Sequence, residues 1–100
     1  MTVAPDTNAA EPVVYLLHFD KPYKHAAHYR GWTVNLSARL ELHAAGRGAR
    51  LLEVITQAGI GGTLARTWPG DRARERQLKR QGGAARQCPI CRARRRGDTR

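Results

Sequence analysis

The sequence predicts a small α/β domain of the α+β kind, in which helices flank a three-stranded antiparallel sheet in the order β-β-α-α-β-α. Residues 13–19 form an apolar run rich in β-branched and aromatic side chains, which is typical of a strand buried on both faces. The turn chemistry of Lys21 and Pro22 predicts a loop over residues 20–28 that leads into an antiparallel strand over residues 29–33. One hundred residues suit one such domain.

The next segment, residues 36–45, has the spacing of an amphipathic helix. Leu36 and Leu40 repeat at i, i+4 and predict a buried stripe. Either Thr33 or Asn35 can cap this helix, because a side-chain oxygen at that position accepts from the free N–H groups of the first turn.

A second helix, a third strand and a third helix are expected in turn. Apolar side chains resume at helical spacing over residues 49–58, and residues 63–68 are predicted to form a strand. Asp71 is a candidate N-cap for a helix that continues to about residue 81. Leu78 is the one large apolar residue of that helix, so most of its surface is expected to face solvent or a ligand.

The two ends of the chain have no apolar periodicity. Residues 1–12 form a polar lead with two prolines, and residues 92–100 form a basic tail. Both segments are expected to be disordered, because they offer little apolar surface to bury. The predicted folded domain is therefore residues 13–91.

The composition predicts a polyanionic partner. The formal net charge is +10, with 18 Lys and Arg against 8 Asp and Glu, and each neutralised phosphate of a nucleic acid releases counterions. DNA is the first partner to consider, and RNA is an alternative. No apolar run approaches the roughly 20 residues of a membrane span, and the amino terminus lacks the order of a secretory signal. A cytoplasmic protein without a membrane partner is expected, and the oligomeric state is left open.

Five side chains of the predicted hairpin and helices are candidates for catalytic chemistry. Tyr15 and Tyr29 should lie close together on the two strands of the hairpin. Arg39 and His43 form an i, i+4 pair on the helix that follows. Glu75 lies in the middle of the last predicted helix, among arginines. The five side chains are expected to line a single cleft on one face of the sheet.

The order of these residues resembles that of the GIY-YIG nuclease superfamily, and in particular its small stand-alone bacterial and phage members. The matching triplets are Val13-Val14-Tyr15 and Tyr29-Arg30-Gly31, and they are followed by Arg39, His43 and Glu75. The resemblance covers residues 13–91. It implies a GIY-YIG-like fold and a metal-dependent DNA endonuclease that hydrolyses phosphodiester bonds.

The resemblance also implies a role for each of the five side chains. Glu75 would hold a divalent cation, Mg²⁺ or Mn²⁺, and Arg39 would bridge phosphate oxygens. Tyr15 or Tyr29 would accept a proton from the attacking water, and His43 would relay a proton.

A non-catalytic alternative fits the same residues. Glu75 is also spaced to pair with Lys79 on an exposed helix, and each tyrosine could be a cross-strand packing residue. The protein would then be a basic nucleic-acid-binding module that keeps the fold. In either case Arg30, Lys79 and Arg80 are candidates for contacts with nucleic acid. A small RNA-associated protein is a third hypothesis.

Two cysteines at C-x-x-C spacing, Cys88 and Cys91, supply half of a structural zinc site. The nearest matching half is His25 and His28, which have the same two-residue gap. A Cys2His2 site of these four residues would tie the carboxyl end of the domain to the hairpin loop. The competing interpretations are a redox pair, two unligated thiols and a zinc ion shared between subunits.

Overall fold

The protein is represented by a computed structural model, which describes residues 11–97 and the side chains from residue 11 to residue 94. Its elements in chain order are β1 (Val13–Tyr23), β2 (Ala26–Thr33), α1 (Leu36–Ala44), α2 (Arg50–Gln57), β3 (Gly62–Pro69), α3 (Arg72–Gln81), α4 (Ala84–Gln87) and α5 (Pro89–Gly97). This order confirms the predicted β-β-α-α-β-α arrangement and adds two helices after it. The expected disordered lead falls almost entirely on residues 1–10, which lie outside the described part of the chain.

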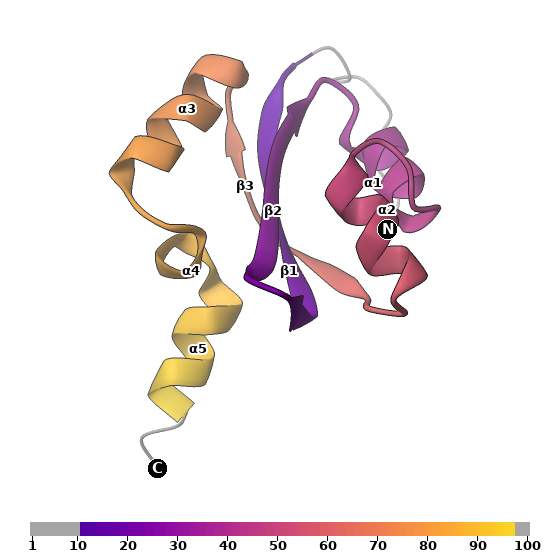
Figure 1. Cartoon of the computed structure of the whole chain (residues 1–100). Helices are drawn as coiled ribbons and strands as arrows, with labels where there is room; N and C mark the ends of the chain where they lie inside the picture. The colour runs from indigo at the N-terminus through magenta and orange to yellow at the C-terminus, as the bar shows by residue number, and fades with distance from the viewer. Residues whose placement is uncertain (1–10, 98–100) are drawn as a thin grey trace.

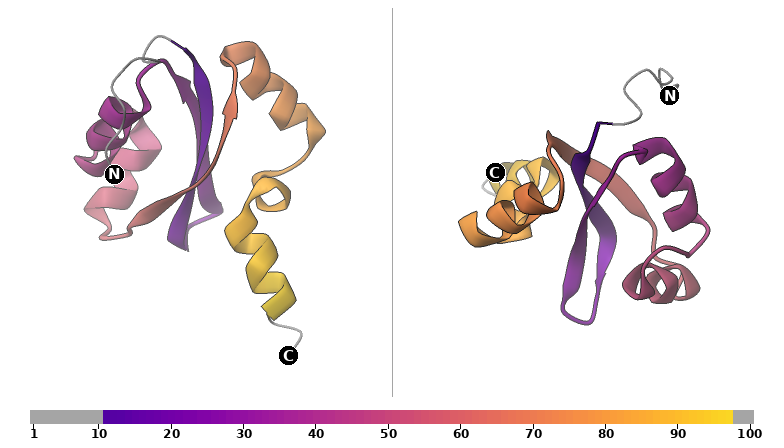
Figure 2. Two further views of the ribbon diagram at one scale, coloured as in Figure 1. Left: turned by 180° about the vertical axis from the view of Figure 1, so that it is seen from behind. Right: turned by 90° about the horizontal axis from the view of Figure 1, so that it is seen from above.

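The sheet lies between two layers of helices (Figures 1 and 2). Its strand order is β2-β1-β3, and both pairings are antiparallel. Helices α1 and α2 lie against one face, while α3, α4 and α5 follow one another along the opposite face. Strand β1 is therefore central, and β2 and β3 are the two edge strands.

Alternating side chains of β1 supply two separate cores, one on each face of the sheet. Tyr15, Leu17 and Phe19 pack toward α1 and α2, with their neighbours in that cluster. Val14 and Leu16 pack in the other direction, toward β3, α3 and the segment that precedes α5. Burying one such aliphatic or aromatic side chain contributes about 1.5–3 kcal/mol. The prediction of a strand buried on both faces is confirmed.

The helix caps predicted from the sequence are present. Asn35 precedes α1 and its side chain accepts from the Ala38 N–H at 3.1 Å. Asp71 precedes α3 and its side chain accepts from the Ala73 N–H at 3.0 Å. These bonds fix where the two helices begin, because each satisfies an N–H group that has no partner within the helix.

The hairpin between β1 and β2 is longer and tighter than expected. A loop over residues 20–28 was predicted, but β1 continues to Tyr23, which pairs with Ala26. Lys24, in the turn, adopts a positive φ of 57°. Farther along the same ladder, His18 and His28 lie directly opposite each other. The predicted loop is thus mostly strand, and this brings two imidazoles together across the ladder.

The carboxyl-terminal segment is also more ordered than expected. Residues 92–97, predicted as part of a disordered tail, belong to α5, which begins at Pro89. Proline suits the first turn of a helix, because its missing N–H would have no helical partner there. The rest of the predicted tail, residues 98–100, lies outside the described chain.

Candidate functional site

Four histidine and cysteine side chains gather where the β1–β2 hairpin meets the start of α5. They are His18, His28, Cys88 and Cys91, and their ligand atoms all lie within 4.8 Å of one another. His18 and His28 come from neighbouring strands, and the two cysteines flank the first turn of α5. Among the described residues this is the one group of three or more such side chains that could hold a metal ion.

Four of the six distances between the ligand atoms of this cluster lie between 3.3 and 3.6 Å. His18 Nδ1 lies 3.3 Å from His28 Nε2, 3.5 Å from Cys88 Sγ and 3.6 Å from Cys91 Sγ. His28 Nε2 lies 3.4 Å from Cys91 Sγ. The cluster therefore brings nitrogen and sulfur donors from two separate parts of the chain close enough to hold one metal ion.

The environment of both imidazoles favours the neutral form, which is the form that binds metals. Burial lowers the pKa of His18, the Arg94 charge lowers it further, and Asp20 opposes the shift. Burial also lowers the pKa of His28, with smaller contributions in the same direction from His18 and Arg30. A neutral imidazole has a free nitrogen lone pair, which a metal ion requires.

One ligand of the predicted zinc site is wrong. His25 was paired with His28, but it lies exposed in the hairpin turn and does not belong to the cluster. His18 takes its place, because the strand register sets it opposite His28. The missed signal is strand geometry, in which residues from two paired strands meet although they are ten positions apart in the chain.

A second polar group is buried beneath α1. The Tyr15 hydroxyl lies 2.7 Å from His43 Nε2, and His43 Nδ1 lies 3.1 Å from the Arg47 carbonyl oxygen. A carbonyl can only accept, so His43 carries its proton on Nδ1 and Nε2 accepts from the Tyr15 hydroxyl. Burial lowers the pKa of His43, the bond to the Arg47 carbonyl raises it, and Arg39 lowers it.

Tyr29 and Arg39 complete this group. The Tyr29 ring lies edge-on to His43 with centroids 5.4 Å apart, and it lies 6.1 Å from the Tyr15 ring. Burial raises the pKa of Tyr15 to about 12, Tyr29 raises it too, and Arg39 acts in the opposite direction. Tyr15 is completely buried, whereas Tyr29 and Arg39 are half-buried. We call Tyr15, Tyr29, Arg39 and His43 the tyrosine cluster.

Glu75 lies in the other helical layer. It belongs to α3, which follows the opposite face of the sheet from α1 (Figure 2). Its carboxylate is 3.8 Å from the Lys79 ammonium group, and it raises the pKa of Arg30 against the larger lowering effect of burial. The expectation that all five candidate residues share one face is therefore not met. The described residues also include no group of three possible ligands around Glu75.

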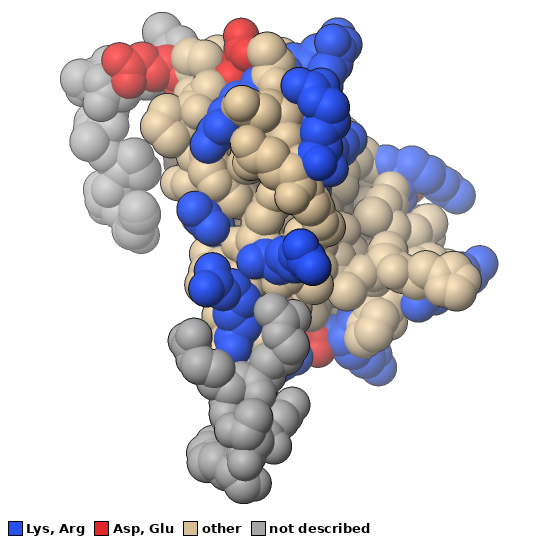
Figure 3. All heavy atoms as spheres, turned by 90° about the vertical axis from the view of Figure 1, so that its left-hand side faces the viewer, with Lys and Arg blue, Asp and Glu red and all other residues tan. Residues whose placement is uncertain are grey.

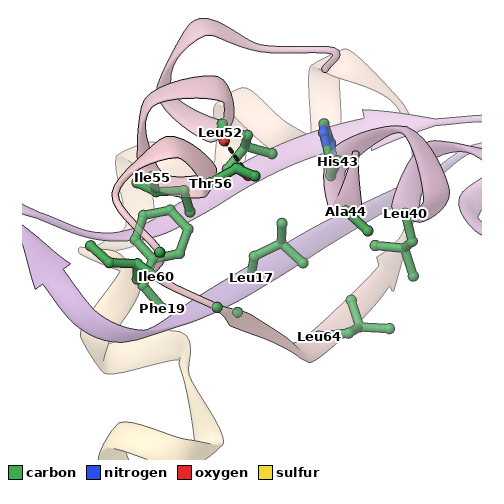
Figure 4. Close-up of a pocket in the computed structure, with 13 residues that line it drawn as sticks. Leu17, Phe19, Leu40, His43, Ala44, Leu52, Ile55, Thr56, Ile60 and Leu64 are labelled. Carbon is green, nitrogen blue, oxygen red and sulfur yellow. Dashed lines mark hydrogen bonds between the residues drawn. The ribbon is translucent and has the colours of Figure 1, made fainter. Parts of the chain in front are cut away.

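A hollow beside the tyrosine cluster is apolar. A cavity of about 480 Å³ lies between α1, α2 and the sheet, and His43 is the one member of the cluster that lines it (Figure 4). Leu17, Phe19 and Leu40 are among the side chains that point into it. Such a lining offers little to a phosphate group, so this cavity is not the predicted catalytic cleft.

Of the predicted nucleic-acid contacts, Lys79 and Arg80 are exposed on α3, but Arg30 is half-buried. The Arg30 guanidinium donates to the Gln87 side-chain oxygen at 2.5 Å. Gln87 in turn donates to the Leu78 carbonyl at 2.9 Å. Arg30 is thus part of the packing between β2 and the helices, and Gln87 is a residue that sequence reasoning missed because its partners are distant in the chain.

Gly31 is the point of closest approach in the tyrosine cluster. A Cβ atom there would lie 2.7 Å from the Tyr15 hydroxyl oxygen and 3.0 Å from Tyr29 Cε2. The buried Tyr15 ring cannot move away without losing its bond to His43. We expect Gly31→Ala to lower the free energy of unfolding by about 1–3 kcal/mol, measured by chemical denaturation. Gly83→Ala is the control, because no atom lies within 4 Å of its new Cβ; an equal loss in both variants would contradict the close packing.

Comparisons of the chain with models of protein families, with curated proteins and with solved structures give no significant match. The resemblance to GIY-YIG nucleases therefore rests on the five residues and the order of the elements. No helix in the described part of the chain is long and apolar enough to cross a membrane.

Proposed function

We propose that this protein is a metal-dependent DNA endonuclease of the GIY-YIG type, and that a structural zinc ion holds its carboxyl-terminal helices. The tyrosine cluster is the observation that carries the nuclease proposal. A buried Tyr15–His43 bond with a fixed tautomer, beside a second tyrosine and an arginine, supports a preorganised polar site in a small domain. Such groups are costly to bury, so packing alone gives no reason for them.

Within the cluster we assign proton transfer to Tyr29. Tyr15 is unsuited to accept a proton from water, because it is buried, its pKa is raised to about 12 and its hydroxyl is bound to His43. Tyr29 is half-buried and lies on the edge strand β2. In its phenolate form it would take the proton of the attacking water while Arg39 binds phosphate oxygens; as the water oxygen bonds to phosphorus, the bond to the leaving oxygen breaks, and solvent water protonates that oxygen. Tyr15 and His43 would position these two groups.

Glu75 would join the site across the edge of β2. Tyr29 and Arg30 are neighbours on this strand, so their side chains leave it on opposite faces. Tyr29 contacts the α1 side, and Arg30 lies near Glu75 on the α3 side. A phosphodiester lying across the free edge of β2 would meet Tyr29 on one side of the sheet and Glu75 on the other. Mg²⁺ or Mn²⁺ would then be held by one carboxylate together with phosphate oxygens and waters, as hard cations accept.

The zinc proposal rests on the distances within the His/Cys cluster. Bonds of about 2.0–2.1 Å to nitrogen and about 2.3 Å to sulfur in a tetrahedron place two nitrogens about 3.4 Å apart and a nitrogen and a sulfur about 3.6 Å apart. The nitrogen–nitrogen separation here is 3.3 Å, and three of the four nitrogen–sulfur separations are 3.4, 3.5 and 3.6 Å; all four ligand atoms lie within 4.8 Å of one another. Four protein ligands leave no open position, so the ion would be structural and would take no part in hydrolysis.

The nuclease proposal is tested with supercoiled plasmid DNA and purified zinc-loaded protein. We expect nicking with Mg²⁺ or Mn²⁺, none when these ions are omitted, and a loss of at least about 100-fold in Glu75→Gln, because the variant lacks the carboxylate charge that holds the cation. Binding to DNA should change little in this variant. Glu53→Gln, the same change on a half-buried position of α2, is the matched control and should cleave normally.

The alternative is a non-catalytic module that binds nucleic acid. The observation in its favour is the separation of Glu75 from the tyrosine cluster by the sheet. If neither cation supports nicking while DNA still shifts in a gel, this alternative holds. Tighter binding to RNA than to DNA of the same sequence would indicate an RNA-associated protein.

A further inference from the structure

The positive charge of the chain is unevenly divided between the two helical layers. In the α1–α2 layer, residues 36–57, three arginines stand against two glutamates. In the α3–α5 layer, residues 72–94, eight lysines and arginines stand against Glu75 alone. Figure 3 shows the side of the molecule formed by this second layer, where blue Lys and Arg atoms are spread over the surface. We call residues 72–94 the basic layer.

Most of the cations of the basic layer are available to a ligand. The exposed ones are Arg72, Arg76, Lys79, Arg80, Arg86, Arg92 and Arg94. Between the described side chains of this layer there is one ion pair, Lys79 with Glu75 at 3.8 Å. A surface with so few internal partners carries an uncompensated field, which attracts anions and repels other cations.

The composition of the basic layer indicates which polyanion it fits. Residues 72–94 contain no Trp, Tyr or Phe, so the layer cannot stack bases in the way that single-strand-binding surfaces do. Its cations stand on the three helices α3, α4 and α5, whose backbones set their spacing. This combination fits the regular phosphate backbone of duplex DNA, which is bound by charge and position without stacking.

The His/Cys cluster connects the parts of this layer. Leu78 is the one buried residue of α3, and α4 has none, so apolar packing alone holds these helices weakly. Gln87 binds the Leu78 carbonyl and Arg30, and the next residue, Cys88, belongs to the cluster. Helix α5 starts between Cys88 and Cys91, so the cluster sets its direction.

We propose that the zinc ion assembles the basic layer into a surface for the phosphate backbone of duplex DNA, with Arg92 and Arg94 of α5 as zinc-positioned contacts. The inference rests on the proposed zinc ion and the proposed DNA partner, and it adds where the DNA binds and what that surface requires. It does not depend on cleavage. The zinc ion thereby controls DNA affinity from a position that does not touch the DNA.

The test measures binding of full-length protein to a fluorescent duplex over a series of salt concentrations. We expect Arg92→Gln/Arg94→Gln to reduce the slope of log K against log salt by about 2, because two phosphate contacts are lost. Arg47→Gln/Arg50→Gln removes the same charge from the opposite layer and should leave the slope unchanged. Equal slopes for the two double variants would overturn the inference, as would tighter binding of a single strand of the same length.

Zinc dependence is measured on the same duplex before chelation, after chelation and after zinc is added back. We expect chelation to lower the slope at least as much as the double variant does, and added zinc to restore it. Unchanged binding by zinc-free protein would overturn the inference. If the zinc-free protein loses its circular dichroism signal, the pair of arginine variants still decides. If the protein nicks DNA but the two double variants have equal slopes, the nuclease proposal holds and this inference fails. If the slope depends on zinc but no nicking occurs, this inference holds and the nuclease proposal fails.

Discussion

Cys88→Ser is expected to abolish zinc binding and to lower the melting temperature by at least about 12 °C. Structural zinc sites bind with apparent free energies of about 10–16 kcal/mol. A loss of even 3 kcal/mol, roughly a quarter of that binding free energy, lowers the melting temperature of a domain of this size by about 12–24 °C. Cys88 is completely buried, so its replacement also leaves a polar hydroxyl without the metal. The measurements are elemental zinc content and thermal unfolding, each with and without chelator.

Two histidine variants make this prediction specific to the observed cluster. His18→Ala should lose zinc, whereas His25→Ala should keep one zinc ion per chain, because His25 is exposed in the turn. Cobalt is a useful probe, since its absorption reports thiolate and imidazole ligands. Zinc loss in His25→Ala, or a full zinc content in Cys88→Ser, would contradict the site. His28→Ala serves as a second test if His18→Ala fails to fold, because His28 is only half-buried.

Tyr29→Phe is expected to reduce DNA cleavage by about 100- to 10,000-fold, the usual contribution of a general base. Its stability should change little, because the lost hydroxyl belongs to a half-buried side chain. The measurement is single-turnover cleavage with saturating Mg²⁺ or Mn²⁺, together with thermal unfolding of the same preparation.

Tyr15→Phe is the matched variant and should behave differently. It removes the hydroxyl that donates to His43 Nε2 and leaves a buried acceptor without a partner, which costs about 1–3 kcal/mol of stability. Cleavage at a temperature where the variant is folded should fall much less than in Tyr29→Phe. A larger loss of cleavage in Tyr15→Phe, with normal stability, would reverse the roles of the two tyrosines.

Much of the fold could be predicted because its signals are local. The apolar run of β1, the caps Asn35 and Asp71, and the order of the elements all follow from residues close together in the chain. The hairpin was mispredicted because Pro22 usually marks a turn. Here it lies near the end of β1, beyond Phe19, the last residue of β1 in register with β3. A proline without an N–H group is tolerated where the ladder is open.

In the candidate sites too, the residues fixed by local patterns could be predicted, and those fixed by tertiary packing could not. The C-x-x-C half of the His/Cys cluster is a local pattern. Its histidine half depends on the strand register, which places His18 and not His25 beside His28. Spacing on α1 brought Arg39 and His43 to Tyr15 as expected. The position of Glu75 could not be predicted, because the side of the sheet on which α3 packs is a tertiary choice that helix periodicity does not determine.

Under the zinc proposal, the wide spacing of the four cluster residues would make the stability of the protein depend on the zinc concentration of the solution. His18 and Cys88 are 70 positions apart, so an unfolded chain does not hold all four ligands together. The proposed zinc ion would therefore bind the folded state almost exclusively. By mass action, each tenfold rise in free zinc above the dissociation constant would add about 1.4 kcal/mol to the free energy of unfolding. Under this proposal, a melting temperature for this protein would have meaning only together with the zinc concentration at which it was measured.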